Sequence, residues 1–217
     1  MVRDGCARTP RASAHNTRSS WAQVGEGSTQ HRDLVDWFRT LPVALDLGGI
    51  RAVHAWWHDE YIDRVRDLQG GRLLEGELLQ AAFTTGSATW EAYEGLSKGP
   101  ELDLPDGASF ADKDGTPRHA VRTQWWNDAG RTYREIAVIG DDQRERIPEL
   151  PLPAHFTATP VSGSPVFVGH YWLTGAVGRR NAKVACLDFS VAACGPLVAY
   201  RWNGESEIDD RHFVQAR

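Results

Sequence analysis

Two histidines stand in the same sequence context, each after a short apolar segment typical of a β-strand. His54 follows Ile50-Arg51-Ala52-Val53, and His170 follows Val166-Phe167-Val168-Gly169. Mixed sheets present ligands and catalytic groups at strand ends, and neutral imidazole binds first-row transition metals well. A lone histidine is more often a buried structural residue. The repeated context favours a binding role, because the glycine before His170 lets the backbone approach an ion or substrate closely.

Hydrophobic spacing, prolines and glycines predict the elements that position these histidines. His54 is expected to end the second strand of a tight hairpin, because Gly48-Gly49 separates two short apolar segments. His170 is expected to end a later strand, in a strand-rich last third of the chain. The expected helices cover about residues 31–40 and 59–80, and the second is broken at Gly70-Gly71. A long surface loop is expected at residues 95–117. The expected strands cover residues 43–47, 50–55, 121–126, 132–139, 166–168, 184–189 and 197–202.

The order of these elements favours an α/β fold of the mixed α+β kind, with most helices in the first half and most strands in the second. Residues 1–20 are rich in Arg, Ser, Ala and Thr without hydrophobic periodicity, which predicts a flexible leader. One folded domain is expected over residues 21–205. Residues 206–217 are expected to form a tail.

The composition excludes several classes of protein. Of the 217 residues 41% are hydrophobic and 9 are Trp, which excludes a disordered or collagen-like chain. The formal net charge of -5 gives no electrostatic reason to expect nucleic acid or an anionic membrane surface as a partner. No segment approaches the roughly 20 apolar residues that span a bilayer. We therefore expect a globular protein with neither a nucleic acid nor a membrane as its partner.

The cysteines favour a reducing compartment. Cys6, Cys186 and Cys194 form an odd set without Cys-x-x-Cys spacing, which argues against a disulfide framework and against a cysteine-based zinc site. Free, buried cysteines are therefore expected. The first twenty residues contain no apolar segment of the kind found in secretory signals. Together these features predict a cytoplasmic location.

Longer segments around the histidines resemble the calcineurin-like metallophosphoesterases. The most similar branch is the bacterial group related to the phosphoprotein phosphatases and the symmetrical dinucleoside tetraphosphatases. The matching segments occur in the family's order and span about Trp21 to Glu205. They are residues 31–42, residues 45–57, the segment Lys98-Gly99-Pro100-Glu101, residues 165–172, and residues 184–191 leading to residues 197–202.

The resemblance implies two β-sheets flanked by helices, and metal-dependent hydrolysis of a phosphoester, either a phosphorylated small molecule or a nucleotide. In that family two divalent ions, Mn, Fe or Zn, clamp the attacking hydroxide and the phosphate. By resemblance, His54 and His170 are ligands of the second metal. Arg122 matches an arginine that holds the phosphate with a bidentate fork. The alternative for Arg122 is a solvated strand arginine.

The family's first-half motifs are absent upstream of His54. These motifs are a strand-ending Asp-x-His, a Gly-Asp-x-x-Asp loop that bridges the metals, and a Gly-Asn-His-Glu motif that supplies a ligand and the general acid. Gly140-Asp141-Asp142 and Asp210-Arg211-His212 imitate two of them, but out of order. A catalytic metal site normally needs three protein ligands. We therefore expect a truncated, C-terminal half of the fold, with no catalytic residue assigned, incomplete metal binding, and weak or no activity alone.

A partial sandwich leaves apolar faces uncovered, which predicts self-association or a complementing N-terminal half as partner. Two other interpretations stay open. The chain is either a non-catalytic interaction module that retains the second half of the fold, or an unrelated mixed domain whose two histidines are buried and fully hydrogen-bonded. The tryptophan pairs Trp56-Trp57 and Trp125-Trp126 either stack on a ligand or place one ring in the core and its neighbour on the surface.

Overall fold

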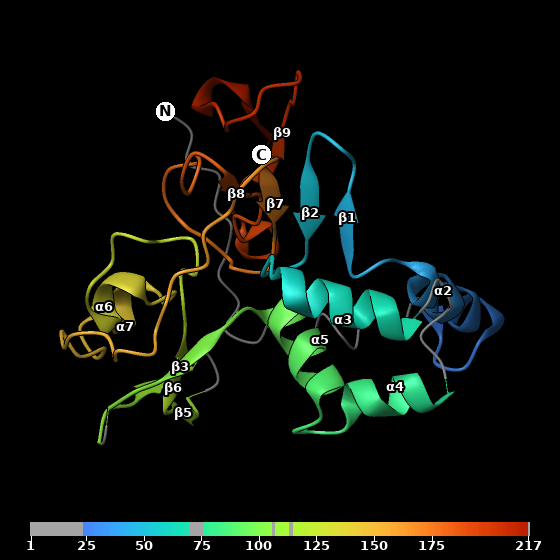
Figure 1. Ribbon diagram of the computed structural model, residues 1–217, viewed down its shortest axis with the longest axis horizontal. Helices are drawn as coiled ribbons and strands as arrows, with labels where there is room; N and C mark the ends of the chain where they lie inside the picture. Colours follow the sequence, from blue (N-terminus) through green and yellow to red (C-terminus); the bar gives the residue numbers. More distant parts are fainter. Residues whose placement is uncertain (1–23, 70–75, 106, 113–114, 217) are drawn as a thin grey trace.

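A computed structural model describes residues 24–69, 76–105, 107–112 and 115–216, and it shows a mixed α/β fold with several small sheets (Figure 1). The leader expected at residues 1–20 lies outside the described residues. The largest sheet has four strands in the order β1(Ala44–Asp46), β2(Arg51–Val53), β7(Val166–Val168) and β8(Val184–Cys186). Strand β2 runs parallel to β7, and β7 runs parallel to β8. Parallel pairing brings the carboxyl ends of these three strands to one edge of the sheet.

The predicted hairpin before His54 is confirmed. Strands β1 and β2 pair antiparallel, with Leu45 opposite Ala52. Gly48 adopts a φ of 80°, which favours glycine, and its N–H donates to Asp46 Oδ1 at 2.9 Å. The Leu47 N–H donates to the Ile50 carbonyl and closes the turn. Local turn chemistry therefore explains why this segment forms a hairpin.

The predicted helices of the first half are also present. They are α2(Thr29–Thr40), α3(Asp59–Gln69) and α4(Gly76–Phe83). Ser28 caps α2 by accepting a hydrogen bond from the His31 N–H. The predicted break at Gly70-Gly71 lies outside the described residues. Within the described parts of the chain, no helix is long and apolar enough to cross a membrane.

The prediction of a long loop at residues 95–117 is wrong. The segment contains the end of helix α5(Ala88–Lys98), strand β3(Glu101–Asp103) and strand β4(Phe110–Ala111). Strand β3 pairs with β6(Ala120–Arg122), and β4 pairs with β5(Pro117–Arg118). Gly99 ends α5 with a φ of 81°, and a Cβ there would lie 2.5 Å from the Tyr171 hydroxyl. The glycines and prolines thus separate short elements rather than marking one loop.

The strand expected at residues 132–139 is also wrong, because helix α6(Tyr133–Ile136) occupies its centre. Thr132 accepts a hydrogen bond from the Glu135 N–H, and the Glu135 carboxylate accepts one from the Thr132 N–H. This reciprocal capping box outweighs the strand propensity of the apolar residues. Tyr133 and Ile136 are both buried. A second short helix, α7(Asp141–Arg144), follows.

The C-terminal segment forms a separate two-stranded sheet of β9(Leu197–Tyr200) and β10(Phe213–Ala216). Two 3-10 turns, η1(Val191–Ala193) and η2(Asp210–His212), accompany these strands. Residues expected as a tail therefore include η2 and a paired strand. Cys186 is buried and free, as expected. The expectation is wrong for Cys194, which is disulfide-bonded.

Buried residues form two separate clusters. The first, here called the sheet core, joins the four-stranded sheet to α3 and α5, and the second, here called the β3–β6 core, joins those strands to α6. Trp125 and Trp126 both lie in the sheet core, 1% and 4% exposed. They follow β6 in a turn, so the strand alternation expected for this pair does not apply. The sheet core includes Val53, Trp57, Ile62, Val65, Leu96, Val166, Val168, Tyr171, Val184 and Cys186; the β3–β6 core consists of Leu102, Leu104, Val121, Tyr133, Ile136, Ala137 and Ile147.

Candidate functional site

The two histidines singled out by sequence lie together at one edge of the four-stranded sheet. His54 follows β2 and His170 lies two residues after β7, and their ring centroids are 5.1 Å apart at an interplanar angle of 59°. The Gly169 N–H donates to the His54 carbonyl at 2.9 Å. A Cβ on Gly169 would meet that same carbonyl oxygen at 3.7 Å. Strand pairing therefore joins residues separated by more than a hundred positions in sequence.

The turn after β7 holds an unusual backbone conformation. His170 has a φ of 69° and Trp172 a φ of 49°, a region that side-chain-bearing residues rarely adopt. Such a conformation persists only where the surroundings enforce it. Tyr171, between them, is buried, and its hydroxyl donates to the Ala55 carbonyl at 3.0 Å. Trp125 Nε1 donates to the same hydroxyl at 2.9 Å, so the core fixes the position of His170.

His170 is a neutral imidazole with a free ring nitrogen. Burial lowers its pKa to about 4, and the positive charges of Arg122 and His54 add to the shift, while Asp188 opposes it. Its Nε2 is buried without a hydrogen-bond partner among the described residues. His54 is exposed. Neither residue therefore matches a buried, fully hydrogen-bonded structural histidine.

Arg122 ends β6 and reaches the same place from the β3–β6 core. Its Nη2 donates to Glu101 Oε1 at 3.1 Å across the β3–β6 pair. Its Nε is buried without a hydrogen-bond partner within the described part of the chain. The side chain is 29% exposed, so it is not a fully solvated strand arginine. The three predicted site residues therefore occupy one neighbourhood, linked by the electrostatic effect of Arg122 on His170.

Two further charged residues belong to this neighbourhood and were missed from the sequence. Asp188 lies two residues after β8, where its Oδ2 accepts from the Trp172 N–H and its Oδ1 from the Ser190 N–H. Lys98 ends α5 and also lowers the pKa of His170. A polar residue follows each of the three adjacent parallel strands β2, β7 and β8, and this shared position is the sequence signal by which Asp188 could have been found. Lys98 opens the segment Lys98-Gly99-Pro100-Glu101, which matches the family by resemblance, but the sequence assigned it no role.

Among the described residues, no third metal ligand accompanies the two histidines. In the described ranges, no group of three or more His, Cys, Asp or Glu side chains is placed to hold a metal ion. The two side chains of the Asp-x-His imitation at the C-terminus instead contact two different segments of the chain. Asp210 Oδ1 accepts from the Arg179 N–H, and His212 Nδ1 lies 3.0 Å from Glu205 Oε1. The structure thus offers two imidazoles and one guanidinium, with an apolar pocket beside them.

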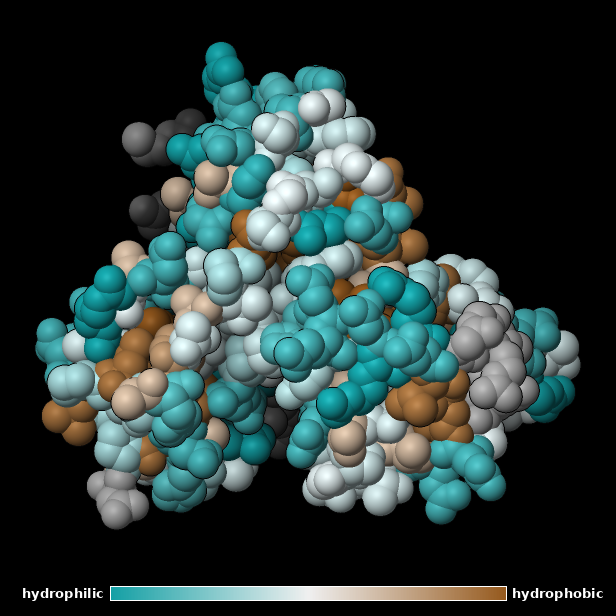
Figure 2. Space-filling model, in the orientation of Figure 1, coloured by the Kyte–Doolittle hydropathy of each residue, from teal (hydrophilic) through white to brown (hydrophobic). Residues whose placement is uncertain are grey.

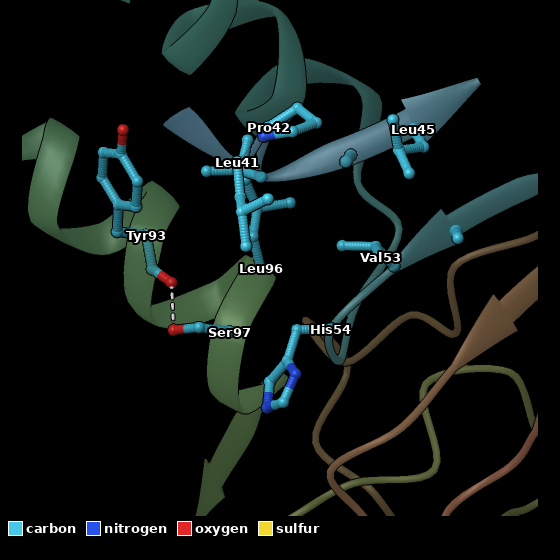
Figure 3. Close-up of a pocket in the computed structure, with 11 residues that line it drawn as sticks. Leu41, Pro42, Leu45, Val53, His54, Tyr93, Leu96 and Ser97 are labelled. Carbon is cyan, nitrogen blue, oxygen red and sulfur yellow. Dashed lines mark hydrogen bonds between the residues drawn. The ribbon is translucent and has the colours of Figure 1, made fainter. Parts of the chain in front are cut away.

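That pocket lies between strands β1 and β2 and helix α5, with His54 at one end (Figure 3). Its volume is about 390 Å³. Leu41 and Pro42 enter it from the segment before β1, and Leu96 faces them from α5. Most of its lining is aliphatic, and the only polar side chains that reach it belong to His54, Tyr93 and Ser97.

Comparison of this chain with protein-family models, with curated proteins and with solved structures finds no match in any of the three. Conclusions about function therefore depend on the residues and their geometry.

Proposed function

We propose that this chain carries part of a metal-dependent phosphoesterase site of the calcineurin-like kind. One observation supports the proposal most: His54 and His170 come from distant segments and lie together at one sheet edge, and Arg122 of β6 is near enough for its charge to lower the pKa of His170. Two imidazoles suit a divalent ion, and a guanidinium suits a phosphate. The substrate class is a phosphoester, either a phosphorylated small molecule or a nucleotide.

The histidines fit a divalent metal ion such as Mn, Fe or Zn. The ion requires a neutral imidazole, and the lowered pKa keeps His170 neutral at pH 7. The Nε2 of His170 is buried and lacks a hydrogen-bond partner among the described residues, which is the condition of a nitrogen available to a metal. His54, being exposed, is free to turn its ring toward the same ion. A bound ion would supply Lewis-acid polarisation of a phosphate oxygen.

The same residues do not fit a complete two-metal centre. Two imidazoles leave such an ion weakly held, and no described carboxylate joins them as a ligand. Hydrolysis by the calcineurin-like mechanism would therefore need carboxylates from beyond the described residues, such as those of a second copy or a complementing chain. Alone, the described residues would bind a phosphate and one ion and hydrolyse poorly or not at all.

Arg122 is proposed to hold the phosphate. Its guanidinium is partly buried, and one of its nitrogens, Nε, is without a partner among the described residues. A phosphate oxygen would satisfy that nitrogen. Lys98 adds positive charge to the same neighbourhood. The Glu101 carboxylate, which now accepts from Nη2, would orient the fork toward the sheet edge.

A second candidate function is a non-catalytic interaction module. The observation in its favour is apolar surface on α2 and directly after β1, where Trp37, Phe38 and Leu47 are 53%, 58% and 64% exposed. Brown side chains reach the surface beside β1 in Figure 2. Exposed apolar patches of this kind often mark protein interfaces. A partner bound there would leave the histidines unused.

Metal binding separates the two functions. Titration of the full chain with Mn²⁺, followed by calorimetry and by the electron paramagnetic resonance signal of the free ion, is expected to show one weak site. His54→Ala and His170→Ala should each remove it, whereas the matched variant His155→Ala, at an exposed histidine, should leave it unchanged. Hydrolysis of an aryl phosphate in excess Mn²⁺ is measured alongside. Metal binding that survives both site variants contradicts the proposed phosphoesterase site.

A further inference from the structure

The apolar pocket beside His54 adjoins the proposed phosphate site through His54, which is the one residue of that site that also lines the pocket. Its floor and walls come from β1, β2 and α5, and His54 closes one end (Figure 3). His54 is also the residue whose ring lies against His170. A ligand in this pocket would therefore extend directly to the imidazoles.

The pocket lining favours an apolar group. Eight of the 11 lining residues are aliphatic or proline: Leu41, Pro42, Val43, Ala44, Leu45, Ala52, Val53 and Leu96. The Ser97 hydroxyl donates to the Tyr93 carbonyl within α5, so its hydrogen-bond donor is already satisfied without a ligand. Apolar walls with few polar groups are the usual composition of small-molecule pockets.

Tyr93 also lines the pocket, and its hydroxyl oxygen is its one side-chain polar atom. Its hydroxyl is buried without a hydrogen-bond partner among the described residues. Burial raises the pKa of Tyr93 to about 12, so the hydroxyl stays protonated at neutral pH. In Figure 3 the Tyr93 ring extends away from His54, so the polar group at the phosphate end of the pocket is the His54 imidazole.

The volume sets the size of the ligand. A cavity of about 150 Å³ lined by aliphatic residues accepts one benzene molecule. The pocket beside His54 measures about 390 Å³, which is room for a bicyclic aromatic group or a short branched alkyl chain. A positively charged neighbourhood at one end and apolar walls along the rest match a ligand with an anionic head and an apolar body.

We propose that this pocket binds the aryl or short alkyl group of a phosphomonoester whose phosphate lies at His54, His170 and Arg122. The proposal rests on the proposed function, since it places the phosphate at that site. It narrows the substrate class from phosphoesters in general to monoesters with an apolar alcohol part. A nucleotide, whose ribose and base carry many polar groups, would leave those groups unpaired against this lining.

Three probes test the pocket in the full chain by calorimetry in the presence of Mn²⁺: 1-naphthyl phosphate, inorganic phosphate and 1-naphthol. We expect 1-naphthyl phosphate to bind roughly tenfold or more tightly than inorganic phosphate, because the aromatic group is buried. Ala44→Phe, which fills the pocket from β1, should remove that advantage without changing phosphate binding. Ala199→Phe, at an exposed alanine of β9, is the matched control. Ser97→Leu narrows the pocket from α5 if Ala44→Phe fails to fold.

The outcomes separate the pocket from the phosphate site. Equal affinity for 1-naphthyl phosphate and inorganic phosphate, with no binding of 1-naphthol, overturns the pocket and leaves the phosphate site standing. Binding of 1-naphthol and 1-naphthyl phosphate with equal affinity, unaffected by His54→Ala, overturns the joint site and the proposed function while showing an isolated apolar pocket. Weakened binding of 1-naphthyl phosphate in both Ala44→Phe and His54→Ala supports the joint site.

Discussion

The sheet core and the β3–β6 core differ in how their polar groups are satisfied. In the β3–β6 region the buried Thr123 hydroxyl donates to the Pro100 carbonyl, and capping bonds close α6. At the edge of the sheet core, His170 Nε2 and Arg122 Nε are buried without hydrogen-bond partners among the described residues. Buried polar atoms of native proteins are almost always paired. These two nitrogens, one on His170 after β7 and one on Arg122 of β6, support the proposal of a ligand between the two regions.

The two regions also differ in how far apart in the sequence their residues lie. The sheet edge joins residues near positions 54, 170 and 188, whereas the β3–β6 core is assembled from residues 102–147. Two links connect them. Arg122 extends from β6 toward His170, and Trp125 carries the chain from β6 into the sheet core. A change at either link is expected to affect the site, whereas a change inside the β3–β6 core should affect stability alone.

The largest effect is expected for Trp125→Ala. This side chain is 1% exposed and bonds both the Ala55 carbonyl and the Tyr171 hydroxyl. Its removal should cost about 3–5 kcal/mol of unfolding free energy and abolish Mn²⁺ binding at the proposed site. Urea unfolding and metal titration measure the two effects. Trp37→Ala, at an exposed tryptophan of α2, should cost less than about 1 kcal/mol.

Ile136→Ala tests whether the β3–β6 core is independent of the site. Ile136 is fully buried in that core, so the substitution should cost about 2–5 kcal/mol in urea unfolding. The pKa of His170, followed by NMR in the folded protein, should stay unchanged. Ile147→Val, in the same core, should cost only about 0.5–1.5 kcal/mol. A shifted His170 pKa in either variant would show that the two regions are coupled.

Arg122→Met removes the charge of one link and keeps much of its apolar stem. Inorganic phosphate should bind roughly tenfold to a hundredfold more weakly, while unfolding free energy changes by less than about 1 kcal/mol. The pKa of His170 should rise, because Arg122 lowers it in the native chain. Arg118→Met, at an exposed arginine paired with Asp112, is the matched control. Unchanged phosphate affinity in Arg122→Met would exclude this residue from phosphate binding.

The last prediction concerns the pH dependence of stability. The pKa of His170 falls from 6.5 to about 4 on folding, so between these values the unfolded chain binds more protons than the folded chain. The contribution of His170 to stability is therefore present above pH 6.5 and is lost as pH falls toward 4. His170→Asn should flatten this part of the stability curve. Urea unfolding of both proteins between pH 4 and 7 measures the difference, and identical curves would contradict the neutral buried imidazole.

Some of the fold and the site followed from local sequence alone. The hairpin before His54 depends on Gly48 and its φ of 80°, and helix α2 depends on the Ser28 cap. Both are decided by bonds between near neighbours, so they could be predicted. The position of His54 and His170 at strand ends followed in the same way, because apolar segments and glycines mark where strands stop.

Other features depended on contacts that sequence patterns do not reveal. Residues 132–139 have the composition of a strand, yet the capping box of Thr132 and Glu135 and the burial of Ile136 make a helix. Residues 95–117 have the composition of a loop, yet β3 finds a partner in β6. In both cases pairing or burial outweighs local propensity.

By itself, the sequence determined which residues are candidates for binding a metal and a phosphate, and it indicated several of the local elements that carry them. Only the tertiary structure decided that His54 and His170 lie 5.1 Å apart by ring centroid, that Arg122 reaches them from another core, and that an apolar pocket opens beside them. The physical reason is that side-chain chemistry and turn geometry are local properties. Parallel strand pairing, by contrast, joins segments more than a hundred residues apart, and burial then sets the pKa of the histidine.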